Sequence, residues 1–297
     1  MLLGQKVSER VAGMRTLPEG IDQRSACRHP DWTGPDDLTI KINELREITD
    51  WAKPIYVKVG ATRTYYDVKL AVHAGADVVV VDGMQGGTAA TQEVFIEHVG
   101  IPTLAAVPQA VQALAELGVH RPRASGGGAP HASGGPTRPE GRGTTGRKGV
   151  QLIVSGGIRT GADVAKAMAL GADAVAIGTA ALIALGDNDP QYAAEYEKLG
   201  SAAGFFDDFQ DGTDPAGIST QDPELAARFD PVEGGRRLAN YLRVLTMEAQ
   251  TLARACGKSH LHNLEPEDLV ALTIEAAAMA RVPLAGTNWI PGLVTQP

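Results

Sequence analysis

The stretch VSGGIRTGADVAKAMALGADAVAIGTA, residues 154–180, decides how the fold of this chain is read. It contains two short apolar runs that end in glycine turns, Ser155-Gly156-Gly157 and Ile177-Gly178-Thr179, with a helix-like segment between them. Glycine adds no side chain and tolerates positive φ, so such turns let the chain pass close to a ligand. Their N–H groups, with the amino-terminal end of the intervening helix, would attract phosphate. We predict that the two turns form one phosphate site, although glycines that merely permit tight turns would give the same pattern.

Strand-like and helix-like segments alternate around this stretch. Apolar strand-like runs occupy residues 55–59, 77–83, 101–107, 151–157 and 173–180, with helix-like segments between them. Such alternation is typical of βαβ crossovers and a parallel sheet. Glycine turns at successive strand ends, and the lack of a GxGxxG motif after any strand, favour a (β/α)8 TIM-barrel type over a doubly wound sheet. We therefore predict an α/β fold of the barrel type, with about five strands visible of the eight in a complete barrel.

The chain is predicted to comprise a barrel domain, residues 1–185, and a helical C-terminal extension, residues 186–297. Within the barrel domain, residues 121–149 are rich in glycine, proline and arginine and contain no large aliphatic or aromatic residue. Such a segment buries too little surface to offset the entropy of ordering, so we predict a disordered loop. A solvated insertion is favoured there over a contact with RNA or an acidic partner. The extension starts loop-rich and acidic, an amphipathic helix follows over residues 236–257, and a further helix is expected over residues 264–282.

Composition and charge argue against several classes of protein. The formal net charge of −8 leaves no large basic face, which argues against a nucleic-acid or anionic membrane surface. No apolar run approaches the roughly 20 residues of a membrane span, and the first residues lack the apolar core of a signal peptide. The two cysteines, Cys27 and Cys256, give neither a disulfide framework nor a CxxC metal motif. We therefore expect a cytoplasmic protein.

Two further features place polar groups at predicted strand ends. Lys58 lies within the first apolar strand, where a buried charge requires a partner. At the mouth of a barrel it could face the electron-rich edge of a cofactor or a substrate carboxylate; the alternative is a lysine that extends to solvent. The turn DGMQGGTAAT, residues 82–91, carries Asp82, Gln85 and Thr88 within reach of a ligand, and its glycines allow close approach.

Two long runs resemble a known flavoprotein domain. They are KVGATRTYYDVKLAVHAGADVVVVDGMQGGTAAT, residues 58–91, and SGGIRTGADVAKAMALGADAVAIGTAALIALG, residues 155–186. Both are similar to the FMN-binding barrel domain of the glutamate synthase large subunit family. The strand lysine, the GGT turn, the SGG turn and the GTAALIALG segment match in that order, so the resemblance is specific. It covers roughly residues 1–185 and, more loosely, residues 214–225. The resemblance implies an FMN-dependent oxidoreductase that acts on CH-NH2 donors.

The resemblance also implies roles for individual residues. Lys58 would lie by the N1/O2 edge of the flavin ring and stabilise its reduced, anionic form, which is a catalytic role. Arg28 and His29, in a turn-rich segment, would be the cationic partners of the substrate carboxylates. In this family ammonia adds to 2-oxoglutarate, and reduced flavin passes a hydride to the resulting 2-iminoglutarate to form glutamate. The residues that would line the FMN site and hold its phosphate are Gly86, Gly87, Thr88, Ser155, Gly156, Gly157, Gly178 and Thr179.

This chain departs from the family pattern in ways that indicate which partner subunits it would require. The family places cysteines for an iron–sulfur cluster soon after GTAALIALG, but this chain reads GDNDPQYAAEYEKLG there. Because no cysteine occurs between Ala180 and Cys256, no cluster is expected in the segment after Ala180. No glutaminase domain precedes the barrel, so partner subunits would supply both ammonia and electrons. The cysteine-poor pattern is similar to the FMN subunit of glutamate-synthase-like enzymes such as N-methylglutamate synthase, whose amine donor is methylamine. The family domain extends upstream of Met1, so we expect an N-terminally truncated barrel.

Other functions stay open at this point. A flavin barrel acting on a hydroxy acid would require a histidine beside an arginine at a late strand end, and SGGIRTG offers Arg159 alone. A flavin barrel acting on a nucleotide would require a catalytic cysteine in a mobile loop, which the sequence lacks. The alternative from another class is a truncated, non-catalytic FMN-barrel fragment, or a subunit that acts only with partner chains.

Overall fold

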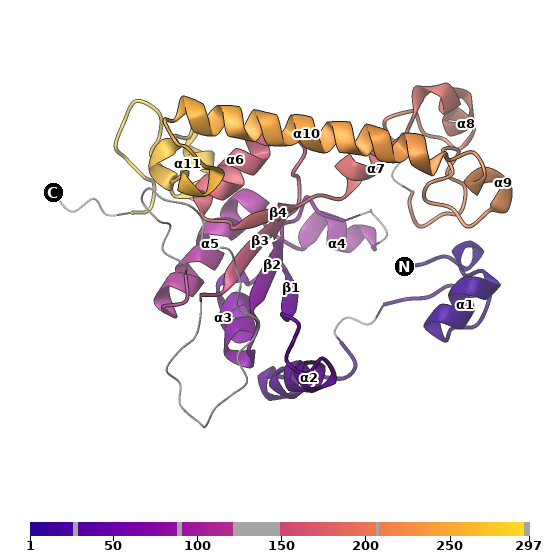
Figure 1. Ribbon diagram of the computed structural model, residues 1–297, viewed down its shortest axis with the longest axis horizontal. Coiled ribbons are helices and arrows are strands. Elements are labelled where there is room, and N and C mark those ends of the chain that lie inside the picture. Colours follow the sequence, from indigo (N-terminus) through magenta and orange to yellow (C-terminus); the bar gives the residue numbers. More distant parts are fainter. Residues whose placement is uncertain (26–28, 88–90, 121–148, 206–207, 294–297) are drawn as a thin grey trace. The chain divides into compact units, whose positions relative to one another are not determined.

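The computed structural model describes residues 1–25, 29–87, 91–120, 149–205 and 208–293 (Figure 1). The chain forms two compact units, each assembled from three separate segments. The first unit comprises Met1–Cys27, Gly86–Val99 and Ile177–Val244, and the second comprises Arg28–Gln85, Gly100–Ala176 and Leu245–Pro297. The predicted loop at residues 121–149 lies outside the described residues except for its last position. The predicted domain division after residue 185 stays a prediction.

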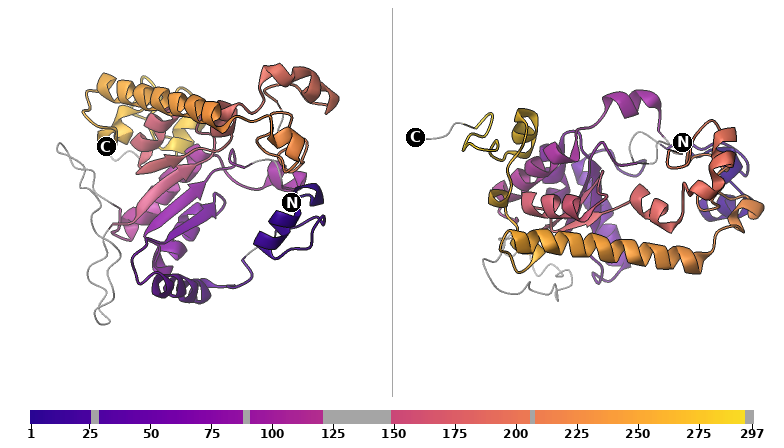
Figure 2. Two further views of the ribbon diagram at one scale, coloured as in Figure 1. Left: turned by 45° about the vertical axis from the view of Figure 1, so that its right-hand side comes forward. Right: turned by 90° about the horizontal axis from the view of Figure 1, so that it is seen from above.

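The second unit contains a parallel sheet whose strands follow one another in sequence order. Its strands are β1 (Tyr56–Gly60), β2 (Val78–Asp82), β3 (Gln151–Ser155) and β4 (Ala174–Ala176). Each strand pairs in parallel with the next, which gives the order β1-β2-β3-β4, and the strands lie side by side in Figure 2. Gly60, Asp82, Ser155 and Ala176 are in register, so the carboxyl ends of all four strands meet at one edge.

Helices cover one face of this sheet. α3 (Thr64–Ala74) contacts β1 and β2, α5 (Thr103–Glu116) contacts β2 and β3, and α6 (Gly161–Leu170) contacts β4. Alternate strand residues point to opposite faces, and the more deeply buried set faces the helices. Its fully buried members are Val79, Val81, Leu152 and Val154.

The sequential strand order identifies the fold class. A doubly wound sheet reverses its strand order at a switch point, whereas the strands of a (β/α) barrel follow in sequence with the helices on one side. No reversal occurs among the described strands. The predicted α/β fold of the barrel type is therefore confirmed, with four parallel strands in the described ranges.

The fifth predicted strand, residues 101–107, is wrong. These residues lead into α5, which begins at Thr103 directly after Pro102. The apolar run continues with helical spacing, because Ala106, Val107, Ala110, Ala113 and Leu114 are all buried along one side of the helix. A short apolar run does not distinguish a buried strand from the first turns of a buried helix.

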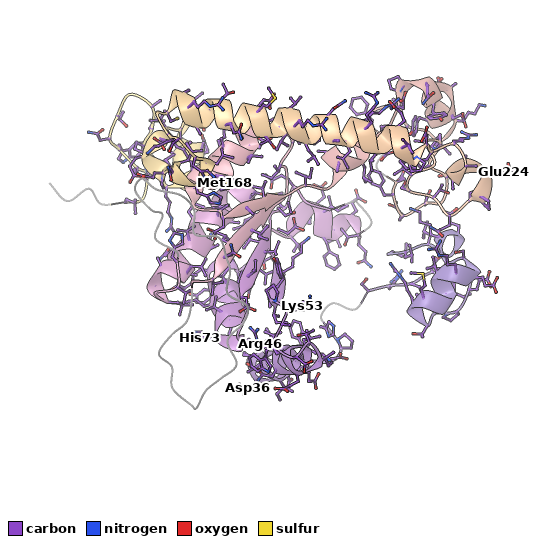
Figure 3. All side chains as sticks on the ribbon, in the orientation of Figure 1. Asp36, Arg46, Lys53, His73, Met168 and Glu224 are labelled. Atoms are coloured by element: carbon purple, nitrogen blue, oxygen red, sulfur yellow. The ribbon has the colours of Figure 1, made fainter. Side chains whose placement is uncertain are left out.

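An anchored helix precedes the first strand. α2 (Pro35–Ile48) carries Arg46, which is labelled in Figure 3. The Arg46 side chain is 8% exposed. Its Nη2 donates to the Gly75 carbonyl at 2.7 Å and lies 3.0 Å from Oδ2 of Asp77. The same Asp77 oxygen accepts from the Ile55 backbone N–H at 2.7 Å. This ion pair, between the buried Arg46 and the half-buried Asp77, therefore ties α2 to the starts of β1 and β2.

The remaining elements are short helices and one long one. The first unit contains η1 (Gly4–Lys6), α1 (Glu9–Arg15), α4 (Glu93–His98), α7 (Thr179–Leu185), η2 (Pro190–Tyr192), α8 (Ala193–Lys198) and α9 (Pro223–Ala226). α10 (Pro231–Ala255) confirms the first predicted C-terminal helix and contributes residues to both units. None of the helices in the described ranges is both long enough and apolar enough to cross a bilayer.

The second predicted C-terminal helix, residues 264–282, is shorter than expected. It divides into η4 (Pro266–Asp268) and α11 (Ile274–Ala280), and η3 (Leu261–Asn263) precedes them. Between η4 and α11 the backbone of Ala271 donates to Pro283 and accepts from Ala285, both at 2.8 Å. This pairing uses backbone groups that a continuous helix would have bonded internally. Thr273 then caps α11 through its side chain.

Candidate functional site

The carboxyl ends of β1 and β2 hold an ion pair on the face of the sheet opposite the helices. Nζ of Lys58 lies 2.7 Å from Oδ2 of Asp82, and the Lys58 side chain is 60% exposed. Lys58 lies two residues before Gly60, so the two residues share one face of β1, and Gly60 is the register partner of Asp82. The strand lysine is therefore neither buried in the core nor free in solvent, because a carboxylate holds its ammonium at the strand ends.

The glycine turn after β3 packs against neighbouring backbone. Gly156 and Gly157 have φ values of 103° and 75°, which side chains rarely adopt. A Cβ at Gly156 would lie 2.8 Å from Oγ1 of Thr103 and 2.9 Å from the Gly83 carbonyl oxygen. Glycine at position 156 is therefore required by packing alone. The turn still offers donors, since no described group accepts from the backbone N–H of Gly157 or Ile158.

Thr103 joins this turn to the loop after β2. Its backbone N–H donates to Oε1 of Gln85 at 3.0 Å, and its hydroxyl lies 2.9 Å from both that oxygen and the Gly156 carbonyl. Thr103 is 8% exposed. The sequence pattern did not reveal this residue, because residues 101–107 were expected to form a strand. The available signal was the helical spacing of the apolar residues that follow it.

Carboxylates bind the amino-terminal end of α6, which the sequence predicts to attract phosphate. Oδ2 of Asp163 accepts from the backbone N–H groups of Arg159 and Thr160, and the Thr160 hydroxyl accepts from the Asp163 N–H in return. Oε2 of Glu248, on α10, accepts from the Gly161 N–H at 2.9 Å. Two carboxylates therefore already occupy the end of the helix, and an incoming phosphate would be repelled there. The contribution of the α6 amino terminus to a phosphate site stays a prediction.

Four other predicted site residues belong to the first unit. They are Gly86, Gly87, Gly178 and Thr179. Gly178 precedes α7 and Thr179 begins it, and a Cβ at Gly87 or Gly178 would meet no atom within 4 Å. The structure thus brings Lys58 and the Ser155–Gly157 turn to one edge of the sheet. The joining of both glycine turns into one phosphate site stays a prediction.

The predicted substrate residues receive little structural support. Arg28 and Thr88 lie outside the described residues. His29 is exposed, its ring stacks on Trp32 with centroids 5.4 Å apart, and its Nδ1 accepts from the Asp31 backbone N–H at 3.2 Å. The contact of these residues with a substrate stays a prediction.

The polar groups at the strand ends fit the FMN that the family resemblance implies. Oδ1 of Asp82 is buried and lacks a partner among the described residues, which is costly unless a ligand or water donates to it. The N–H groups of Gly157 and Ile158, which have no acceptor among the described residues, suit phosphate oxygens. The Lys58 ammonium suits a ring edge that becomes negative on reduction. The edge therefore supplies both kinds of contact that this cofactor needs.

A buried acidic cluster lies in the first unit. Asp187 and Asp214 are 2% and 0% exposed, and the Tyr196 hydroxyl donates to Oδ1 of Asp214 at 3.4 Å. Asp214 also accepts from the backbone N–H groups of Ala216, Ile218 and Ser219 at 2.7–2.9 Å. The Asp214 carboxylate therefore folds the loop that follows it.

Burial in this cluster shifts the pKa values of the titratable groups within it. Burial, and then the nearby charge of Asp214, raises the pKa of Asp187 to about 6. Burial also lowers the pKa of Lys6, whose ammonium donates to the Phe209 carbonyl. Asp187 belongs to the GDNDPQY segment, whose sequence predicts an acidic loop. In the described part of the chain, no three His, Cys, Asp or Glu side chains lie together as a metal site would need.

We expect Asp187→Asn to stabilise the protein in a pH-dependent way. The folded state holds the Asp187 proton more tightly than the unfolded state, whose carboxyl titrates near 3.8. The stability contributed by this group is therefore present below about pH 4 and lost as the pH rises past 6. The variant should have a higher Tm than the wild type at about pH 7.5, with the difference vanishing toward pH 4. A Tm difference that stays constant between these pH values would contradict the assignment.

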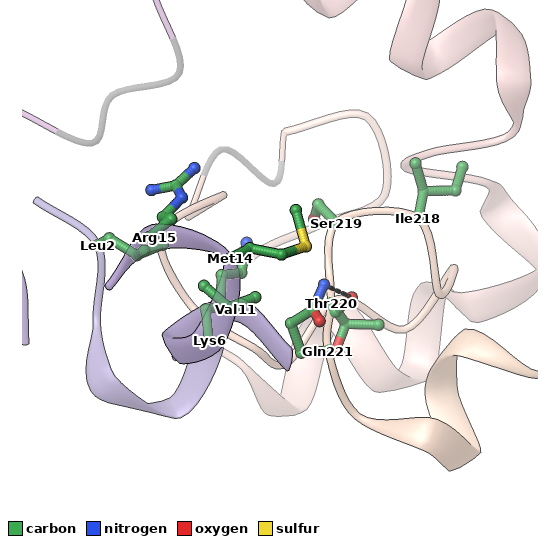
Figure 4. Close-up of a pocket in the computed structure, with 9 residues that line it drawn as sticks. All are labelled: Leu2, Lys6, Val11, Met14, Arg15, Ile218, Ser219, Thr220 and Gln221. Atoms are coloured by element: carbon green, nitrogen blue, oxygen red, sulfur yellow. Dashed lines mark hydrogen bonds between the residues drawn. The ribbon is translucent and has the colours of Figure 1, made fainter. Parts of the chain in front are cut away.

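A separate cavity of about 310 Å³ lies within the first unit (Figure 4). Lys6, Met14 and Arg15 line it from the N-terminal segment, and residues 218–221 line it from the loop that Asp214 organises. The hydroxyl of Ser219 is buried there without a partner among the described residues. The sequence pattern assigned no role to these residues.

The sequence matches a known protein family over most of its length. Residues 1–125, 142–191 and 210–259 match the family described as the conserved region in glutamate synthase. A glutamate synthase large subunit-like protein of Rhizobium meliloti (strain 1021) is 70% identical over 292 residues. An archaeal glutamate synthase (NADPH) of Methanocaldococcus jannaschii is 36% identical over 264 residues.

The relatives are longer than this chain. The match covers 98% of this chain but 60% of the Rhizobium protein, and 89% of this chain but 43% of the archaeal one. Among solved structures, a mutant flavocytochrome b2 with pyruvate bound gives a TM-score of 0.44 at 18% identity, covering 85% of this chain and 40% of that one. The sequence matches alone show that the chain belongs to the glutamate synthase family.

Proposed function

We propose that the chain is the FMN-binding part of a glutamate synthase-type oxidoreductase. It would reduce 2-iminoglutarate, formed from 2-oxoglutarate and ammonia or an amine, to glutamate or an N-substituted glutamate. One observation carries the proposal beyond family membership. Lys58, held by Asp82, lies at the same edge of the sheet as the unpaired N–H groups of Gly157 and Ile158. That edge offers a cation and phosphate donors on neighbouring strands.

Each predicted site residue has a role in this proposal. The turn Ser155-Gly156-Gly157 would hold the FMN phosphate, together with Gly178 and Thr179. Gly86, Gly87 and Thr88 would line the cavity beside the ring. Lys58 would stabilise the negative charge at the N1/O2 edge of the reduced ring, with Asp82 as its positioning residue. Arg28 and His29 would bind the substrate carboxylates.

The overall reaction balances without a protein nucleophile. The amine condenses with the keto carbonyl of 2-oxoglutarate, and water leaves. FMN, when bound, would supply the hydride (two electrons and one proton) that C2 of the imine requires. The chain's own groups would orient the substrate by its carboxylates and fix charge near the ring. The imine nitrogen takes up a further proton, which completes the amino group.

Partner chains would complete the enzyme in the cytoplasm. The chain spans 60% of the Rhizobium relative, and the archaeal relative carries NADPH in its name. We propose that separate subunits deliver ammonia or an amine and the reducing electrons, because no iron–sulfur cluster is expected after Ala180. The alternative is a non-catalytic FMN-barrel fragment, which the four-stranded sheet of the described residues favours, since a complete barrel has eight strands.

Flavin binding and Lys58→Ala test the proposal together. The full chain with added FMN should retain the visible absorbance of oxidised flavin after gel filtration. Lys58→Ala should slow flavin reduction about tenfold or more while FMN affinity changes only about threefold, because the lost charge acts mainly on the reduced ring. Stopped-flow absorbance with a chemical reductant measures the first quantity, and fluorescence quenching measures the second.

Two outcomes separate the alternatives. Lys53→Ala removes an exposed lysine before β1 and is the matched control, for which both quantities should stay unchanged (Figure 3). A wild-type chain that takes up no FMN would overturn the proposal. FMN uptake without oxidation of the reduced cofactor by 2-oxoglutarate plus ammonia or methylamine would favour the non-catalytic fragment.

A further inference from the structure

We propose that the Gln85 carboxamide is a phosphate ligand of the flavin site and that Thr103 is its positioning residue. This inference rests on the proposed function for the identity of the ligand. The sequence pattern suggested a phosphate site built from glycine turns and the end of a helix. The structure closes that helix end with carboxylates and places a side-chain amide beside the glycine turn instead.

Thr103 fixes which way the amide points. Its backbone N–H, which can only donate, lies 3.0 Å from the Gln85 oxygen Oε1. The opposite orientation would set the Nε2 hydrogens against that N–H, so the oxygen must face Thr103. Nε2 therefore points away from Thr103, and no described group accepts a hydrogen bond from it. Gln85 is exposed, and its two Nε2 hydrogens have no acceptor among the described residues.

The amide lies beside the glycine turn. A Cβ built on Gly157 would lie 3.2 Å from Cβ and 3.8 Å from Cδ of Gln85. The unpaired N–H groups of Gly157 and Ile158 belong to the same turn. The hydroxyl of Thr103 also reaches the Gly156 carbonyl at 2.9 Å. One buried residue, Thr103, therefore contacts both the turn and the amide, and we infer that their N–H donors act as a single group.

The donor set selects an anion. It consists of backbone and amide N–H groups, and the charge of the carboxylate at this edge, Asp82, is balanced by Lys58, whose ammonium pairs with Oδ2. A phosphate monoester offers three acceptor oxygens with about two negative charges near neutral pH, which suits several N–H donors at once. Riboflavin carries the same ring without the phosphate. Affinity for FMN relative to riboflavin therefore reports on this group of donors.

Gln85→Glu is the decisive variant. It keeps the size of the side chain and the acceptor facing Thr103, and it replaces the two N–H donors with a charged oxygen. We expect it to weaken FMN binding about 30-fold and riboflavin binding less than about threefold, because only FMN brings a phosphate to the new charge. Fluorescence quenching of each flavin gives both dissociation constants. Gln109→Glu, on α5 and outside the site, makes the same charge change and should alter neither.

Thr103 variants test the positioning role. Thr103→Val removes the hydroxyl and should lower the ratio of FMN to riboflavin affinity about threefold to tenfold, whereas Thr103→Ser should restore that ratio. A purely structural defect would weaken both flavins equally and leave the ratio unchanged. Equal weakening in Gln85→Glu, or no effect on FMN, would overturn the inference.

Inorganic phosphate separates this inference from the proposed function. Phosphate binding to the wild-type chain, measured by calorimetry and lost in Gln85→Glu, would support the Gln85 site even if FMN failed to bind. FMN binding that inorganic phosphate does not compete away, and that Gln85→Glu does not weaken, would overturn the Gln85 site and leave the proposed function standing.

Discussion

Gly83→Ala should destabilise the protein by at least about 3 kcal/mol and abolish its flavin site. A Cβ at this position would lie 1.8 Å from Oγ1 and 2.7 Å from the backbone Cα of Thr103. A rotation of the Thr103 side chain relieves only the first clash, so the backbone of α5 must move away from the end of β2. That movement would also break the hydrogen bonds from Thr103 to Gln85 and Gly156. Urea unfolding of the purified chain measures the loss.

Gly60→Ala provides the matched control for Gly83→Ala. Gly60 ends β1 as a neighbour of the same sheet edge, but a Cβ there meets no atom within 4 Å. Its urea midpoint should match that of the wild type within error. If Gly83→Ala is insoluble, the double variant Gly83→Ala/Thr103→Ala can be measured instead. It should recover only part of the lost free energy of unfolding, because the clash with the backbone of residue 103 persists. A Gly83→Ala chain as stable as Gly60→Ala would show that the packing of α5 on β2 is wrong.

Gly161→Ala should cost about 2–3 kcal/mol even though alanine suits the first turn of a helix. The added Cβ would lie 2.4 Å from both the Glu248 Cβ and the Leu245 carbonyl oxygen, and 2.5 Å from the Ala249 backbone N. Two of these three atoms belong to the backbone of α10, so no change of rotamer removes the clash. The start of α6 must separate from α10, and the bond from the Gly161 N–H to Glu248 must break.

Gly235→Ala is the control variant for Gly161→Ala. Gly235, within α10, has no atom within 4 Å of an added Cβ, so Gly235→Ala should stabilise the chain by about 0.5–1 kcal/mol. Thermal unfolding of the two variants should therefore shift in opposite directions from the wild type. Faster amide exchange confined to α6 in Gly161→Ala would identify the broken contact. A rise in Tm for both variants would contradict the close approach of the two helices.

Local sequence signals predicted the parallel sheet and the positions of Lys58 and the Ser155–Gly157 turn at its strand ends. The continuous valines of β2, the glycine turn after β3 and the lysine within β1 all lie where their local pattern indicated. The prediction of a strand at residues 101–107 was wrong because a short apolar run beside a proline is compatible with a buried strand and with a buried helix. Because of this error, Thr103, which contacts the glycine turn after β3, was not predicted as a site residue.

The part of the site that sequence could not give depends on distant contacts. Glu248 reaches the Gly161 N–H across 87 positions, and Thr103 reaches Gly156 across 53. Neither residue belongs to a motif of its own, so nothing local distinguishes them. The sequence did not predict the acidic cluster of Asp187 and Asp214 for a similar reason. Acidic residues in a loop-rich segment are usually solvated, and only the tertiary fold buries these two.

Because Lys58 lies on β1, it also affects whether the protein self-associates in solution. Among the strands that the structure describes, β1 pairs with β2 alone, so its other edge presents unpaired backbone groups. Such an edge, bearing Tyr56, Val57 and Val59, invites strand addition between molecules, and a lysine on it opposes aggregation. Lys58→Ala would therefore promote self-association as well as slow flavin reduction. Its kinetics should be measured on material that light scattering shows to be monodisperse.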